Sequence, residues 1–216
     1  MSGRILTLAQ QKGGSGKTTI AAHLAVAFML GGKSVAILDV DPQGSLGEWF
    51  EAREEKFGED DAGLTFRTAS GWGARREARS LARDHDVVVL DTPPKSDLES
   101  RPAIEIADLV VIPVQPTPVD VWATEPTLEL IAKENAEGIL VINRAVKRAT
   151  LTGEMCDAID ALGPRVARNG LGSRVAFAAS MGEGRTVSEA APSSPAAKEV
   201  DALAAEIQKI LKKLAK

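Results

Sequence analysis

The sequence has few of the features that mark membrane, secreted or metal-cluster proteins. No apolar run approaches the roughly 18 residues that a membrane-spanning helix requires. The N-terminus, MSGRILTLAQ, does not have the layout of a signal peptide. The single cysteine, Cys156, excludes an internal disulfide framework and argues against a cysteine-bound metal or iron–sulfur centre. We therefore expect a cytoplasmic protein.

Acidic residues outnumber basic ones, but not along the whole chain. The formal net charge is −4. Up to residue 139 there are 14 Lys and Arg against 22 Asp and Glu, and from residue 140 there are 12 against 8. A basic C-terminal third suggests a surface for a polyanion. On these counts alone, a chance distribution of solvated charge explains the asymmetry equally well.

Short β-branched runs alternate along the chain with longer amphipathic or apolar segments. The strand candidates are residues 4–10, 34–39, 64–69, 86–91, 108–114 and 138–144. The helix candidates are residues 17–31, 45–57, 73–84, 100–107, 122–135, 151–162 and 196–216. This order predicts an α/β fold, a single domain over residues 1–216 with a mostly parallel sheet flanked by helices on both faces. Nucleotides bind such sheets at the carboxyl edge of the strands.

The stretch QQKGGSGKTT, residues 10–19, follows the first predicted strand and opens a helix. Its glycines allow backbone N–H groups to close around phosphate oxygens, and the start of the helix adds the positive end of its dipole. Lys17 would reach the β- and γ-phosphates, and the Thr18 hydroxyl would bind Mg²⁺. The predicted nucleotide-binding residues here are Gly13, Gly14, Ser15, Gly16, Lys17, Thr18 and Thr19.

The loop departs from the general Walker A pattern at one position. That pattern requires glycine five residues before Gly16, where this chain has Gln11. The actual sequence, KGGSGKTT, resembles the deviant Walker A motif of the ParA/MinD family of P-loop ATPases, with Lys12 at the position of that family's signature lysine. The resemblance implies ATP as ligand and an ATP-dependent sandwich homodimer, in which Lys12 reaches the phosphates bound by the partner subunit.

Three aspartates follow the loop in the order that the ParA/MinD family has. Asp39 and Asp41 stand in LDVDPQGS, and Asp91 ends VVVLD before DTPP. The resemblance implies that Asp41 orients the attacking water, that Asp39 supports the Mg²⁺ shell or the loop, and that Asp91 is the Walker B carboxylate near Mg²⁺. It also implies that Asn143, which ends GILVIN, reads the adenine edge. Taken singly, each of the four residues is commonly a turn former or helix cap.

Three further segments resemble the short ParA-type partition ATPases such as ParF. They are DPQGSLGEW, DLVVIPVQPTPVDVWA and RVAFAASMGEGRTVSE. Little sequence precedes the first predicted strand, so we expect no N-terminal DNA-binding domain of the kind found in larger partition ATPases. Among related ATPases, the nitrogenase iron protein needs two cysteines per subunit and the bacterial tyrosine kinases need a tyrosine cluster, whereas this chain has one cysteine and no tyrosine.

The C-terminal stretch IQKILKKLAK leaves a MinD-like alternative open. Its apolar residues fall on one helical face and its lysines on the rest, as in a helix that lies on a membrane surface. The apolar stripe continues backwards through Val200 and Leu203, and the tail lacks Phe and Trp anchors. We therefore expect this helix to pack on the sheet rather than on a membrane.

The resemblance favours non-specific DNA over membrane as the bound surface. The candidate DNA-binding residues are Lys147, Arg148, Arg165, Arg168, Arg174 and Arg185. Each alone is equally well explained as solvated charge. The sequence thus predicts a weak, partner-stimulated, nucleoid-associated ATPase that positions a cargo through a ParB-like or other adaptor protein. The alternatives are a membrane-associated ATPase of MinD type and a small-molecule ATP-dependent ligase or kinase.

Overall fold

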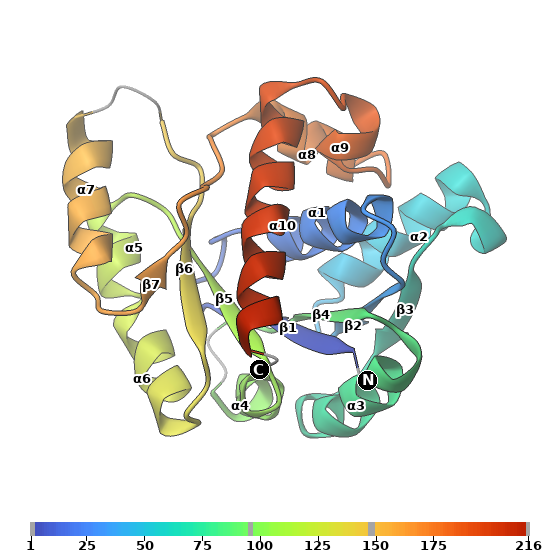
Figure 1. The fold of residues 1–216 in the computed structure, drawn as a ribbon, viewed down its shortest axis with the longest axis horizontal. Coiled ribbons are helices and arrows are strands. Elements are labelled where there is room, and N and C mark those ends of the chain that lie inside the picture. Colours follow the sequence, from blue (N-terminus) through green and yellow to red (C-terminus); the bar gives the residue numbers. More distant parts are fainter. Residues whose placement is uncertain (1–2, 95–96, 147–149, 215–216) are drawn as a thin grey trace.

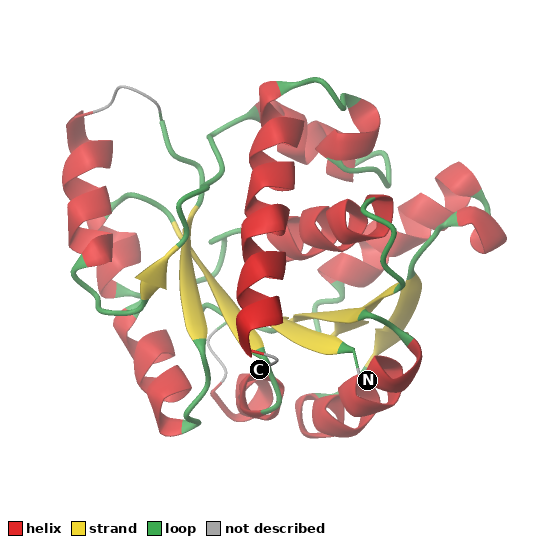
Figure 2. Cartoon of the chain, in the orientation of Figure 1, coloured by secondary structure: helices red, strands yellow, loops and turns green. Residues whose placement is uncertain are grey.

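The computed structural model describes residues 3–94, 97–146 and 150–214, and within them it has a seven-stranded sheet between two layers of helices (Figures 1 and 2). The strands are β1 Arg4–Leu8, β2 Val35–Asp39, β3 Thr65–Thr68, β4 Val87–Asp91, β5 Leu109–Val114, β6 Gly138–Ile142 and β7 Arg165–Val166. Their order is β3-β2-β4-β1-β5-β6-β7, and neighbouring strands pair in parallel. The predicted α/β fold with a parallel sheet is confirmed.

The helices cover both faces of the sheet. Beside β1 and β2, one face is covered by α1 Lys17–Leu30, α2 Ser45–Phe57, α8 Val175–Met181, α9 Val187–Ala190 and α10 Pro195–Leu214. The other face is covered by α3 Ala74–Asp84, α4 Asp97–Glu105, α5 Pro118–Trp122, α6 Glu125–Lys133 and α7 Thr150–Asp160. Two 3₁₀ turns, η1 Glu59–Asp61 and η2 Gly71–Gly73, flank β3. Because both faces are covered, β5 is apolar throughout and β4 is apolar up to Asp91 at its end.

The register of the sheet brings the ends of three strands level. Leu8 of β1 pairs with Asp91 of β4, and Asp91 in turn pairs with Asp39 of β2. The polar residues that follow these strands therefore meet at one edge. This is the carboxyl edge, where nucleotides bind parallel sheets.

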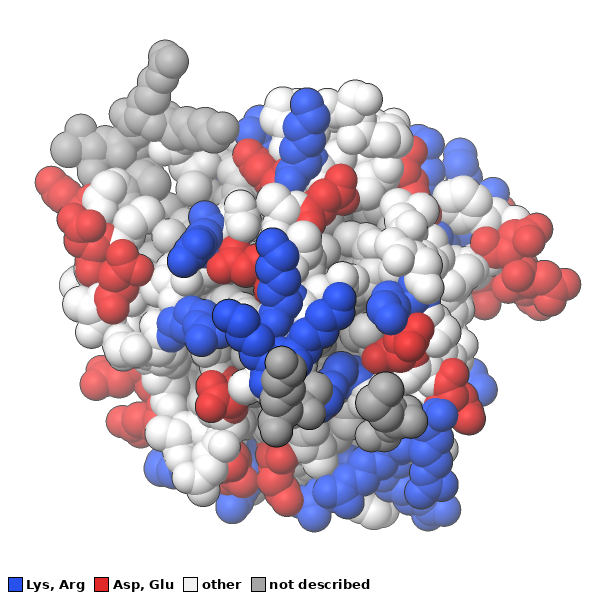
Figure 3. Space-filling model, viewed as in Figure 1, with Lys and Arg blue, Asp and Glu red and all other residues white. Residues whose placement is uncertain are grey.

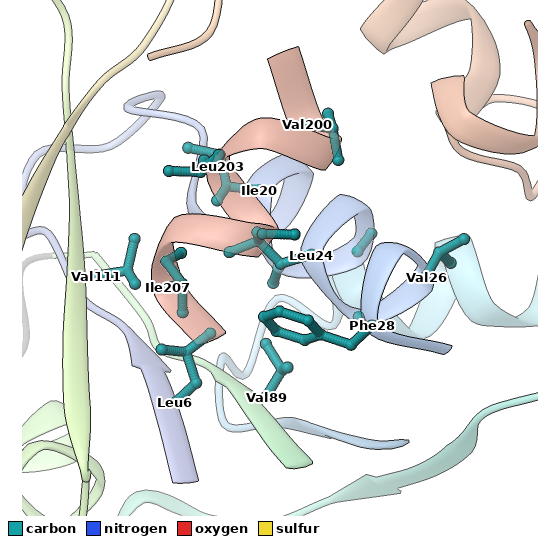
Figure 4. Packing of buried hydrophobic residues seen from close by; sticks show 14 of the residues in the cluster. Leu6, Ile20, Leu24, Val26, Phe28, Val89, Val111, Val200, Leu203 and Ile207 are labelled. Carbon is teal, nitrogen blue, oxygen red and sulfur yellow. The ribbon is translucent and has the colours of Figure 1, made fainter. Parts of the chain in front are cut away.

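The largest apolar cluster lies between the sheet, α1 and α10 (Figure 4). Ile20 and Leu24 of α1 face Leu203 and Ile207 of α10. The apolar stripe of the tail is therefore buried as far as Leu211, as the core-packing interpretation predicts, whereas Leu214 near the end of α10 is exposed. Over the described residues, no helix combines the length and apolar character that crossing a membrane requires.

Several boundaries differ from the predicted ones. The helix expected over 122–135 is wrong, because α5 ends at Trp122 and α6 begins at Glu125. Each of the two helices has a proline in its first turn, where the missing N–H costs nothing, so Pro126 starts a new helix instead of continuing one. Three short elements, α8, α9 and β7, are not predicted from the sequence, because they have only two to seven residues each.

His23 is a buried polar side chain within the α1 core. The Nδ1 atom of its ring lies 2.7 Å from the carbonyl oxygen of Thr19. The Nε2 atom accepts a hydrogen bond from the backbone N–H of Val187 at 3.2 Å. Since Nε2 accepts, Nδ1 carries the proton and donates to Thr19. Burial lowers the pKa of His23 to about 4, so the ring is neutral in the folded chain.

We expect His23 to make the fold acid-sensitive. The unfolded chain takes up a proton on this ring near its ordinary pKa of about 6.5, well above the folded value. Stability is therefore lost as the pH falls from about 6.5 towards 4, by on the order of 3 kcal/mol. Denaturant unfolding at pH 7 and pH 4.5 measures this loss, and His23→Gln should remove it. Equal pH dependence in both proteins would contradict this assignment.

Candidate functional site

The loop between β1 and α1 forms an open cradle of backbone N–H groups. Gly14 and Gly16 adopt left-handed conformations, with φ of 77° and 100°. A Cβ atom at Gly16 would also lie 2.3 Å from the amide nitrogen of Asn143, so only glycine fits there. Because α1 begins at Lys17, the first N–H groups of the helix point into this cradle. The arrangement suits an anion such as a phosphate group.

Lys17 brings a cation into its own loop. Its ammonium group donates a hydrogen bond to the carbonyl oxygen of Gln10 at 3.0 Å, and the residue is buried. Burial lowers the pKa of Lys17, while the nearby charges of Asp91 and Asp41 raise it. The lysine therefore closes the cradle from within and can neutralise phosphate oxygens there.

Thr18 and Asp91 form a pair beside the cradle. The Thr18 hydroxyl donates to Asp91 Oδ2 at 2.5 Å, whereas the buried Oδ1 atom has no partner among the residues that the structure describes. Burial raises the pKa of Asp91 to about 7, against the opposing effect of the Thr18 hydrogen bond. A nearby cation would favour the charged carboxylate. A hydroxyl, a carboxylate and a phosphate are oxygen ligands of the kind that Mg²⁺ takes, so the pair fits this ion.

Asp39 fixes the loop that carries Asp41. Its carboxylate accepts hydrogen bonds from the backbone N–H groups of Asp41, Leu46 and Gly47 at 3.0, 3.2 and 3.1 Å. Burial raises the pKa of Asp39, and these hydrogen bonds partly offset the rise. Of the two roles that the resemblance implies for Asp39, this geometry corresponds to support of the loop. Asp41 lies half-buried at its start and accepts a hydrogen bond from the N–H of Gln43 at 3.0 Å.

Asn143 touches the cradle directly. Its amide nitrogen donates to the carbonyl oxygen of Ser15 at 2.7 Å, and its amide oxygen accepts from the N–H of Arg144 at 2.9 Å. Both ends of the side chain are thus engaged within the chain. Asn143 also lines a cavity of about 340 Å³ with Thr19 and residues 171–174, beside the start of α1. Sequence reasoning did not identify this cavity, because its walls come from distant segments.

Lys12 stands at the rim of the loop, outside the cradle. Its side chain is 30% exposed, and its Nζ atom lies 2.5 Å from Oδ2 of Asp120 on α5. The two residues before Lys12 also contact the chain just after α5. The Gln10 side chain donates a hydrogen bond to the Thr124 hydroxyl, and the N–H of Gln11 donates to the Thr127 hydroxyl. The two lysines of the loop therefore have different surroundings, one inside the cradle and one outside.

The comparison with known families agrees with this geometry. The model of the CobQ/CobB/MinD/ParA nucleotide-binding domain matches residues 6–214. The chain belongs to this family. It is a P-loop ATPase of the ParA/MinD type, and its full-length similarity to positioning and partitioning proteins makes it ParA-like within the family.

Two curated relatives illustrate this ParA-like character, and one solved structure shows the same fold. The chain is 30% identical to maintenance of carboxysome distribution protein A of Halothiobacillus neapolitanus, over 84% of this chain and 85% of that protein. It is 29% identical to the chromosome-partitioning ATPase Soj of Thermus thermophilus, over 94% and 95%. The septum site-determining protein MinD of Pyrococcus horikoshii, complexed with Mg-ADP, has the same fold, with a TM-score of 0.79, 20% identity and 99% coverage of each chain.

The structure separates the basic residues of this ParA-like chain into two groups. Arg165 and Arg168 are exposed and line one hollow of about 740 Å³ with Lys209 and Lys213 of α10. Arg174 instead pairs with Glu199, and Arg185 pairs with Glu183. Lys147 and Arg148 lie outside the described residues. Among the described members of the predicted set, only Arg165 and Arg168 share this hollow, and the tail lysines Lys209 and Lys213 line it with them.

Proposed function

We propose that the chain is an ATP-dependent dimerising switch that binds DNA without sequence preference and positions a cargo. The observation that carries this proposal is the second lysine of the loop. Lys17 already occupies the cradle, so Lys12 is not needed for phosphates bound in its own chain. A cation at the rim can instead neutralise charge on phosphates held by a second subunit, as an arginine finger supplied in trans does.

Hydrolysis would need little chemistry beyond positioning. The backbone N–H groups of the loop and the Lys17 ammonium hold the phosphates, and Thr18 with Asp91 would hold Mg²⁺, which neutralises phosphate oxygens when bound. Asp41 orients the attacking water from a loop that Asp39 fixes in place. The intrinsic rate would be low, and an adaptor protein on the cargo would raise it.

The cavity beside Asn143 offers a place for the base. It adjoins the start of α1, and its walls include Thr19, Asn143 and residues 171–174. A nucleotide whose phosphates lie in the cradle would extend its sugar and base in this direction. Asn143 would then act at the junction of the phosphate and base sites, through its bond to Ser15 as well as through the base edge.

The hollow lined by Arg165, Arg168, Lys209 and Lys213 is the proposed DNA surface. Figure 3 shows basic side chains gathered over the C-terminal half of α10. None of these four side chains forms an ion pair within residues 3–94, 97–146 and 150–214. Such cations would contact phosphates and release counterions, which gives binding without sequence preference. A chain that binds DNA through this surface would be associated with the nucleoid.

We expect Arg165→Ala/Arg168→Ala to weaken ATP-dependent binding to a random DNA duplex by about tenfold or more and to reduce its salt slope by about two. The loss reflects two phosphate contacts, so ATP affinity should stay unchanged. Fluorescence anisotropy over a salt series measures both quantities, with ATP, ADP and no nucleotide. The matched control is Arg76→Ala/Arg79→Ala on the exposed face of α3, which removes the same charge. An equal loss in the control would show that total charge, and not this surface, determines binding.

The burial of most of its apolar stripe argues against membrane docking of the tail helix, although Leu214 is exposed. Ile207, Ile210 and Leu211 are buried in the core cluster, so membrane insertion would require α10 to leave the sheet. Liposome cosedimentation with and without residues 207–216 distinguishes this alternative from DNA binding.

A further inference from the structure

Lys12 is paired within its own chain with Asp120, a residue in the first turn of α5. Thr117 caps this helix by accepting from the N–H of Asp120, and its hydroxyl also donates to the Asp120 carboxylate. The Lys12 ammonium lies 2.5 Å from the same carboxylate oxygen. The two residues are 108 positions apart in sequence, so only the fold brings them together.

The Asp120 side chain is only 4% exposed, so Lys12 supplies the charge that makes its burial tolerable. Over the described part of the chain, no other cation forms an ion pair with Asp120. The pair is therefore favoured as long as the subunit is alone. A lysine that left Asp120 would have to find a new anion of comparable strength.

We propose that Asp120 is a latch that holds Lys12 in the resting subunit and releases it only to a partner subunit's nucleotide. This inference rests on the trans role of Lys12 proposed above. The ammonium exchanges a carboxylate of its own chain for phosphate oxygens of the other chain. Without a nucleotide in the partner, no such anion is present and Lys12 stays on Asp120.

The latch lowers the affinity with which two ATP-bound subunits dimerise. A subunit whose competent state is populated only part of the time binds with an affinity reduced by that fraction. Asp120 lowers the fraction of time that Lys12 is free. Asp120 is therefore a positioning residue that acts through Lys12, and its removal should favour the dimer.

The test compares Asp120→Asn with the wild-type chain by analytical ultracentrifugation, with a non-hydrolysable ATP analogue and Mg²⁺. We expect the dimer dissociation constant to fall by about tenfold, because asparagine keeps the shape but not the charge. Asp120→Ser removes the same charge with a smaller side chain, if asparagine does not fit. A merely structural role predicts weaker or unchanged dimerisation, and either result in a folded variant would overturn the latch.

The variants Lys12→Gln and Lys12→Gln/Asp120→Asn separate the latch from the proposed function. If Lys12 acts in trans, both should dimerise poorly, and the Asp120 change should no longer help. Wild-type dimerisation of Lys12→Gln would instead overturn the trans role itself. Amine footprinting of the wild-type chain without nucleotide gives a second readout: Lys12 should acylate more slowly than Lys209, and Asp120→Asn should remove the difference.

Discussion

Lys12→Gln is expected to lower the adaptor-stimulated rate of ATP hydrolysis by about 100-fold or more while leaving ATP binding within about twofold of the wild type. The rate falls because the variant lacks a cation that stabilises charge developing on the partner's phosphates, and single donors or trans cations of this kind contribute 10² to 10⁵ in rate. Binding persists because Lys17 and the backbone N–H groups of the loop are untouched. Steady-state phosphate release and nucleotide titration measure the two quantities.

Two controls keep this prediction specific. Lys198→Gln removes the same charge from an exposed position of α10 away from the proposed DNA surface and should leave the hydrolysis rate unchanged. Lys12→Gln also leaves Asp120 buried without its cation, so the double variant with Asp120→Asn shows whether the loss comes from the missing ammonium or from local damage. Hydrolysis at the wild-type rate in the single variant would refute the trans role.

Arg53→Met should reduce the free energy of unfolding by about 3–5 kcal/mol, since it leaves a partly buried carboxylate without its cation. Arg53 of α2 is almost completely buried and donates two hydrogen bonds to Glu189 at 2.7 and 3.0 Å. It also donates to the carbonyl oxygens of Ala62 and Gly184. The midpoint of thermal unfolding should fall by roughly 10 °C. Scanning calorimetry and urea unfolding measure both changes.

The neighbouring pair of Arg185 and Glu183 is the matched control for Arg53. It lies nearer the surface, so Arg185→Ala should change stability by less than about 1 kcal/mol. Arg53→Met combined with Glu189→Gln should be less destabilising than the sum of the two single changes, because the unpaired charge is then absent. A full additive loss would show that packing, not charge compensation, dominates at this position.

The sequence was sufficient for the parts of the site that are local in the chain. The loop at residues 10–19 lies between a strand and a helix, and Asp39 and Asp91 end strands that the register brings level. The glycine-rich loop and the ends of strands can be predicted from the sequence, because residues close together in the chain determine them. Their relation to one another then follows from the parallel sheet.

The remaining features depend on pairings between distant segments. Nothing near Lys12 in sequence indicates Asp120. Nothing near Arg174 indicates that Glu199 neutralises it, whereas Arg165 has no ion pair among the residues that the structure describes. The break between α5 and α6 was missed because the apolar periodicity runs through it, although Pro126 marks a possible helix start. Periodicity records which residues are buried, not whether one helix or two bury them.

The tryptophans of this chain give the α5 region an optical signal of its own. The chain has three tryptophans and no tyrosine, so near-ultraviolet emission comes from Trp49, Trp72 and Trp122 alone. Trp49 is buried, whereas Trp72 and Trp122 are 86% and 71% exposed. In a Trp72→Phe chain, iodide would therefore quench mainly Trp122, two residues from Asp120. Its quenching constant then reports, without any attached label, whether nucleotide alone or only a second subunit covers the segment that holds Lys12.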